Sequence, residues 1–225
     1  MSRAEAGGCW ESRLSALWDR GVLVITSARP GRDHRDVALA AARAGAGGIQ
    51  LRMKGVSDRE FLSQARAVRE ICSRHGIPFF VNDRVDVALL SGADGVHLGP
   101  EDLPLPQARR LAPGMALGFS AGNREELREA EEGGADYVGV GPVWATSSKS
   151  DAGLPLGLEH LRELCRLSSL PVVAIGGIGP AEAEEAVAAG ARAVAVLSFV
   201  REAPSVEKAV EALLRAVVRG RERRR

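Results

Sequence analysis

Charged and amide side chains recur in this sequence within and directly after short apolar runs. Gln50, Arg52 and Lys54 are spaced two residues apart, so on an extended segment their side chains would share one side. Arginine presents a planar fork of donors to phosphate oxygens, and lysine presents a point charge. Gln50 and Arg52 also lie inside an otherwise apolar run, which argues against solvated surface charges. The pattern predicts a binding site for a phosphorylated ligand.

Two carboxylates follow the next two apolar runs. Asp83 comes directly after Asn82, and Asp102 lies in a later loop. Two carboxylates completed by water and substrate phosphate oxygens are a typical Mg²⁺ site. Helix capping explains the same residues as well: Asp102 would precede a helix that starts near Pro104, and Asp83 one that starts near Arg84. From the residues alone both interpretations stay open, and the first implies magnesium as the cofactor.

Hydroxyl groups and glycines supply a second set of candidates. Glycine lets main-chain N–H groups approach an anion closely, so a glycine-rich turn can cradle a phosphate. The segment from Thr146 to Lys149 adds three hydroxyls and one ammonium. Together with the first site, these groups predict a pocket for two phosphorylated groups. The candidates of this set are Ser120, Thr146, Ser148, Lys149, Gly177, Leu197 and Ser198.

The elements that must position these residues alternate along the chain. Eight short runs, several of them near-continuously apolar, are separated by helical patterns, as expected of parallel strands covered on both faces. No G-x-G-x-x-G follows the first run, and no linker divides the chain, so we expect a closed barrel rather than an open dinucleotide-binding sheet. In such a barrel the active site lies where strands end, which is where the candidates fall. The expected strands are Val22–Thr26, Gly48–Arg52, Pro78–Val81, Gly95–Leu98, Ala116–Phe119, Tyr137–Val140, Val172–Ile175 and Ala193–Leu197.

The predicted organisation is therefore a single-domain (β/α)8 TIM barrel of the α/β class with a short N-terminal helical extension. Residues 1–21 form the extension, with Leu14, Leu17 and Trp18 as the apolar face of a helix. Residues 22–218 form the catalytic barrel. Residues 219–225 are strongly basic, and we expect them to be a frayed, solvated tail.

Composition limits the classes of partner. The chain has 225 residues and a formal net charge of only +1, so no overall field draws it to nucleic acid or to a membrane. No apolar run approaches the roughly 18 residues of a spanning helix, and no secretory signal is visible. The three cysteines are scattered and predict neither a disulfide framework nor a zinc site. We expect a cytoplasmic protein that binds small molecules, and whether copies form a homo-oligomer stays open.

Taken in order, these motifs resemble those of the thiamine phosphate synthase family, over about Val22 to Val217. Each motif is modest alone, but their order and spacing are specific. The matching segments are Gln50-x-Arg52-x-Lys54, Val81–Asn82–Asp83, Gly95–Val96–His97–Leu98–Gly99 with Glu101–Asp102, Gly118-x-Ser120, Gly139–Val140–Gly141–Pro142 with Thr146-x-Ser148–Lys149, and Ala174–Ile175–Gly176–Gly177–Ile178.

The resemblance implies an enzyme that joins hydroxymethylpyrimidine diphosphate to a thiazole phosphate and releases pyrophosphate. It implies that Mg²⁺ is bound by Asp83 and Asp102, that Lys149 balances the leaving charge, and that Ser120 contacts the pyrimidine. The residues implied for the pyrimidine diphosphate are Gln50, Arg52, Lys54 and Asn82, and those for the thiazole phosphate are Thr146, Ser148, Gly177 and Ser198, beside Leu197.

Four positions depart from the family pattern: Met53, Pro100, Ser27 and Gly122. None of them removes a predicted phosphate or metal ligand. A related thiazole tautomerase would need a general acid–base near the loop after the fifth strand, where Gly122 replaces a common histidine. A non-catalytic regulatory barrel that binds phosphate is the other alternative, since fold alone does not fix function.

Overall fold

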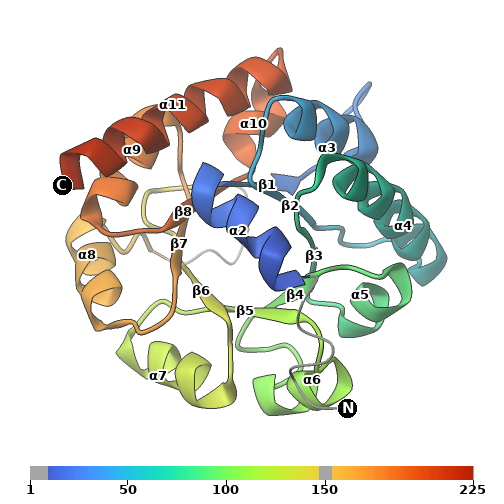
Figure 1. Ribbon diagram of the computed structural model, residues 1–225, viewed down its shortest axis with the longest axis horizontal. Coiled ribbons are helices and arrows are strands. Elements are labelled where there is room, and N and C mark those ends of the chain that lie inside the picture. The colour runs from blue at the N-terminus through green and yellow to red at the C-terminus, as the bar shows by residue number, and fades with distance from the viewer. Residues whose placement is uncertain (1–9, 147–153, 225) are drawn as a thin grey trace.

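Eight parallel strands form a closed barrel in chain order, which confirms the predicted fold class. The structure is a computed structural model that describes residues 10–146 and 154–224. Figure 1 shows the strands as an inner ring with helices around it. The strands are β1 Val22–Thr26, β2 Gly48–Leu51, β3 Phe79–Asn82, β4 Gly95–Leu98, β5 Ala116–Ser120, β6 Tyr137–Val140, β7 Val172–Ile175 and β8 Ala193–Val196.

Helices cover the outside of the barrel, and the two surfaces of the strands bury different groups. The outward strand residues pack against the helices in the larger apolar cluster, whereas the inward ones form a smaller cluster inside the ring. Burial on both sides explains the near-continuous apolar runs of the sequence. The helices are α2 Trp10–Arg20, α3 His34–Arg43, α4 Asp58–His75, α5 Val85–Ser91, α6 Leu105–Leu111, α7 Arg124–Gly133, α8 Leu158–Leu167, α9 Pro180–Ala189, α10 Ser198–Glu202 and α11 Val206–Arg224.

The same turn leads into two of these strands. Gly92 and Gly134 end α5 and α7 in the left-handed conformation that glycine favours. Two residues later, Asp94 accepts a hydrogen bond from the backbone N–H of Phe79 at 2.9 Å, and Asp136 accepts one from that of Leu117 at 2.8 Å. Each aspartate thus ties its own strand to the preceding one at the amino end of the barrel.

The predicted N-terminal helix is α2, and it lies across the centre of the ring in Figure 1. Leu14 and Leu17 are buried in the cluster inside the barrel, and Trp18 packs edge-on against Tyr137, the first residue of β6. This contact places α2 at the amino ends of the strands, opposite the end where the candidates gather. Among the described residues, no helix is long and apolar enough to cross a membrane.

The prediction of a frayed basic tail was wrong, because residues 219–224 are the last turns of α11. Arg219 and Arg223 both pair with Glu184 of α9, at 2.7 and 3.0 Å. Arg221 donates hydrogen bonds to the carbonyls of Trp18 and Asp19 at the end of α2, where a cation also complements the helix dipole. Three of the basic residues therefore contact α9 and α2 as part of an ordered helix.

Candidate active site

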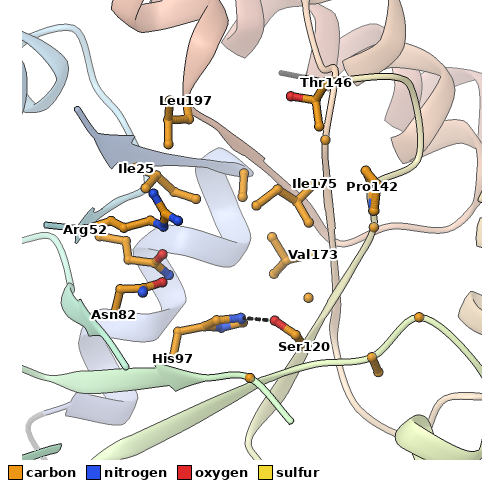
Figure 2. Close-up of a pocket in the computed structure, with 18 of the residues that line it drawn as sticks. Ile25, Arg52, Asn82, His97, Ser120, Pro142, Thr146, Val173, Ile175 and Leu197 are labelled. Atoms are coloured by element: carbon orange, nitrogen blue, oxygen red, sulfur yellow. Dashed lines mark hydrogen bonds between the residues drawn. The ribbon is translucent and has the colours of Figure 1, made fainter. Parts of the chain in front are cut away.

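A cavity of about 670 Å³ opens at the carboxyl ends of the strands. All eight strands or the loops that follow them contribute to its lining, as expected of an active site in this fold. Figure 2 shows Arg52, Asn82, His97 and Ser120 turned into one space, with apolar side chains of β1, β7 and β8 around it. The predicted residues that line the cavity are Gln50, Arg52, Lys54, Asn82, Asp83, Asp102, Ser120, Thr146, Gly177, Leu197 and Ser198.

The cationic side of the cavity comes from β2 and the loop after it. Gln50 lies within β2 and is only 3% exposed, whereas Arg52 and Lys54 follow the strand, which ends one residue earlier than expected. The Nε of Arg52 is buried and has no hydrogen-bond partner among the described residues. A buried donor without a partner is costly, so an acceptor placed in the cavity beside this guanidinium would be stabilising.

The two carboxylates lie on neighbouring loops of the same cavity. Asn82 of β3 is paired in register with His97 of β4, and the backbone N–H of Asp83 donates to the His97 carbonyl at 2.9 Å. Asp83 has a φ of 66°, which is uncommon for a residue other than glycine. Asp102 accepts a hydrogen bond from the Gly99 N–H at 2.6 Å.

The capping interpretation of these aspartates was wrong. The N-cap residue of α5 is Arg84 and that of α6 is Pro104, and neither helix has a side-chain capping hydrogen bond. Among the described residues, no cluster of three or more acidic, histidine or cysteine side chains could enclose a metal. Two carboxylates at an open cavity fit Mg²⁺, which usually keeps several waters and takes substrate phosphates as further ligands.

The opposite side of the cavity is built on the turn after β7. Gly177 has a φ of 67°, and a Cβ there would lie 2.6 Å from the carbonyl oxygen of Ala145 and 2.8 Å from Cβ of Trp144. Only glycine therefore allows the turn to approach the loop after β6 so closely. Ser148 and Lys149, predicted from that loop, lie outside the described residues.

His97 and Tyr137 are cavity residues that the sequence-based site prediction missed. The His97 ring contacts the Tyr137 hydroxyl through Nδ1 at 3.1 Å and the Ser120 hydroxyl through Nε2 at 3.0 Å. Tyr137 is fully buried, and burial raises the pKa of its hydroxyl far above the usual value. One signal was available: His97 is the one polar side chain in β4, as Gln50 is in β2.

The loop after β5 is held by two side chains from neighbouring helices. The N–H of Gly122 donates to Glu126, and the Gly122 carbonyl contacts Nε2 of His160 at 3.0 Å. Of the described histidines, His97 is the one that lines the cavity. The acid–base histidine that a tautomerase would place in this loop therefore has no counterpart at residue 122.

The closed barrel and the charges at its carboxyl end define a TIM-barrel enzyme of the kind that handles phosphorylated small molecules. The family model described as thiamine monophosphate synthase matches residues 22–200 of this chain. The chain belongs to that family, as its motifs predicted.

Individual relatives agree over most of the chain. The thiamine-phosphate synthase of Moorella thermoacetica is 46% identical over 205 residues, covering 91% of this chain and 98% of the relative. That of Methanocella arvoryzae is 52% identical over 171 residues, covering 76% and 81%. The solved structure of thiamine phosphate pyrophosphorylase from Pyrococcus furiosus superposes with a TM-score of 0.85 at 40% identity, covering 91% of this chain and 99% of that one.

Proposed function

We propose that this protein is a transferase that joins hydroxymethylpyrimidine diphosphate to thiazole phosphate, giving thiamine phosphate and pyrophosphate. The bond from the methylene carbon to the diphosphate oxygen breaks, and the diphosphate keeps its electron pair. The thiazole ring nitrogen supplies the pair for the new carbon–nitrogen bond. The observation that carries this proposal is one cavity that combines Arg52, whose Nε has no partner among the described residues, with the carboxylates Asp83 and Asp102 and the Gly177 turn.

The β2 side of the cavity is proposed to hold the pyrimidine diphosphate. Arg52 and Lys54 would bind diphosphate oxygens, and the buried amides of Gln50 and Asn82 would bind polar atoms of the pyrimidine or its diphosphate. These cations are in place before the bond breaks, so stabilising the charge of the leaving group requires little reorganisation. Ser120, at the end of β5, would contact the pyrimidine itself.

Asp83 and Asp102 are proposed to hold Mg²⁺ beside the diphosphate. A bound magnesium ion would neutralise part of the diphosphate charge and so make it a better leaving group. The neighbouring backbone supports this role, because the Gly99 N–H fixes the Asp102 carboxylate and the His97 carbonyl fixes the main chain at Asp83.

The turn after β7 and the start of α10 are proposed to seat the thiazole phosphate. Gly177, Leu197 and Ser198 line the cavity, and Thr146 lines it from the loop after β6. Ser148 would add a further hydroxyl to that phosphate. Lys149 is proposed to place its ammonium at the departing diphosphate.

The proposal has a direct test with the purified full chain. Given both substrates and Mg²⁺, the protein should release pyrophosphate and thiamine phosphate in equal amounts, and omitting either substrate should abolish both products. Thiazole phosphate alone should be recovered unchanged. Isomerisation of thiazole phosphate without the pyrimidine diphosphate would instead favour the tautomerase, and binding of both compounds without turnover would favour a regulatory barrel.

Arg52→Lys is the variant that tests the site within this assay. It keeps the charge but loses the planar fork and the buried Nε donor, so it should raise KM for the pyrimidine diphosphate. Arg35→Lys is the matched control, because Arg35 is exposed and pairs with Asp33 on the outside of the barrel. Equal kinetics for the two variants would remove Arg52 from the site.

The setting of the reaction is also a proposal. The net charge of +1 supports small molecules, rather than nucleic acid or a membrane surface, as partners. We propose that the protein acts in the cytoplasm.

A further inference from the structure

Four side chains form a continuous row from the helix that closes the barrel to the cavity at its other end. Trp18 of α2 packs edge-on against Tyr137, with 6.1 Å between ring centroids. Tyr137 reaches His97, and His97 reaches Ser120, through hydrogen bonds of 3.1 and 3.0 Å. Figure 2 shows the contact between His97 and Ser120 at the base of the cavity. The proposed reaction assigns a role to Ser120 and none to Tyr137 or His97.

Burial fixes the direction of these hydrogen bonds. Tyr137 is fully buried, and the raised pKa keeps its hydroxyl protonated. Among the described residues, Nδ1 of His97 is the one polar atom that hydrogen-bonds this hydroxyl. A buried O–H group that does not donate is costly, so the tyrosine donates and Nδ1 accepts. The proton of the neutral imidazole is then on Nε2.

The consequence reaches the cavity through Ser120. Nε2–H of His97 donates to Oγ of Ser120, which leaves the serine proton directed away from the histidine. We propose that Tyr137 is a positioning residue that holds His97 in the Nε2–H tautomer and thereby makes Ser120 a hydrogen-bond donor toward the substrate. The group that fits such a donor is a neutral acceptor, such as an unprotonated ring nitrogen of a heteroaromatic substrate. This last assignment rests on the proposed function.

The strand register explains why the two rings meet. His97, Gly118 and Tyr137 are paired in one row across β4, β5 and β6. Because Gly118 has no side chain, the His97 and Tyr137 side chains approach each other above it. A Cβ at Gly118 would lie 2.2 Å from Cζ of Tyr137 and 2.5 Å from Nδ1 of His97. Two residues after Tyr137 on β6, Gly139 leaves room for the imidazole, since a Cβ there would lie 3.0 Å from its Cε1.

Aromatic packing also holds the phenol in place. Phe80 and Trp18 both meet the Tyr137 ring edge-on, with interplanar angles of 73° and 68°. The hydroxyl therefore has little freedom to turn toward another acceptor.

In the opposite arrangement, Nδ1–H would donate to the tyrosine and Ser120 would donate to Nε2. The serine would then offer only lone pairs to the substrate, so the histidine tautomer distinguishes the two arrangements.

The test is nitrogen-15 NMR of the histidine rings in the ligand-free full chain at about pH 8. The His97 signals are assigned with His97→Gln. We expect the wild type to show the Nε2–H tautomer. Tyr137→Phe keeps the ring but removes the donor, and it should lose the preference for that tautomer. Trp18→Phe is the control. It alters the packing on the Tyr137 ring but keeps the Tyr137 hydroxyl, so the His97 tautomer should stay unchanged.

Kinetics measure the effect on the proposed reaction. Tyr137→Phe should lower kcat/KM about tenfold, as expected for one misdirected hydrogen bond, and Trp18→Phe should change it less. A wild-type His97 protonated at Nδ1, or a tautomer that is the same in Tyr137→Phe, would overturn the inference. Because the NMR measurement needs no turnover, absence of thiamine phosphate synthesis would count against the proposed function alone.

Discussion

Replacement of Gly177 by alanine tests whether the turn after β7 must approach the loop after β6. The new methyl group destabilises the folded protein in two ways. A residue other than glycine at a φ of 67° costs about 1–2 kcal/mol. The methyl carbon would also lie 2.6 Å from the Ala145 carbonyl oxygen and 2.8 Å from Cβ of Trp144, and such overpacking costs about 1–3 kcal/mol. We expect Gly177→Ala to lower the free energy of unfolding by about 2–5 kcal/mol, the sum of these costs.

Gly76→Ala is the matched control for this variant. Gly76 ends α4 with a φ of 64°, and a Cβ there would have no neighbour within 4 Å. It therefore reports the backbone cost alone, and any gain from the stiffer unfolded chain is common to both variants. Urea unfolding should give Gly177→Ala an additional loss of about 1–3 kcal/mol.

Kinetics should separate the two variants as well. To relieve the contact in Gly177→Ala, the loop that carries Thr146 must move, so KM for thiazole phosphate should rise about tenfold, as for the loss of one good hydrogen bond. Gly76→Ala should leave KM unchanged. Equal stability losses and equal KM values in the two variants would refute the close approach.

Three further predictions follow from the charges. Lys149→Ala should lower kcat about a hundredfold and change KM for the pyrimidine diphosphate little, because a cation at the departing diphosphate acts mainly in the transition state; a change in KM alone would make Lys149 a binding residue. Asp102→Asn should raise the Mg²⁺ concentration for half-maximal rate about tenfold or more, and an unchanged magnesium titration would remove it from the metal site. Burial lowers the pKa of His34 below its ordinary 6.5, so the unfolded chain binds a proton that the folded protein does not. The free energy of unfolding should therefore fall as the pH drops below about 6.5, and His34→Gln should remove that part of the slope in urea unfolding.

The barrel could be predicted because its signals are local. Each strand is a mainly apolar run of four or five residues, and six of the eight are followed directly by a polar residue or glycine, the exceptions being β5 and β8. The predicted and observed strand bounds differ little. For example, β2 ends at Leu51 instead of the predicted Arg52, since the arginine leaves the strand pairing and lines the cavity. The ring of active-site positions then follows from the fold without further information.

The basic C-terminus was mispredicted because its partners are distant in sequence. Arg219 and Arg223 pair with Glu184, 35 and 39 residues away, and Arg221 binds carbonyls of α2 about 200 residues away. Read locally, a run of arginines indicates a solvated end. The closed ring brings the first and last helices together, and this supplies the acceptors that the local sequence lacks.

The contact between His97 and Tyr137 depends on a third kind of information, the register between strands. In the sequence, Gly118 is a glycine inside a strand, which could mark a bulge or a close approach. The strand register shows why a glycine is needed there: Gly118 is paired with His97 on β4 and with Tyr137 on β6. The same relation recurs one row toward the amino end, where Gly95 is paired with Phe80 and a Cβ would lie 2.8 Å from that ring. Inside a closed barrel a small residue on one strand makes room for a large one on its neighbour. The inward glycines therefore identify the large side chains of the interior once the register is known, and this leads from Gly118 to the hydrogen bonds beneath Ser120.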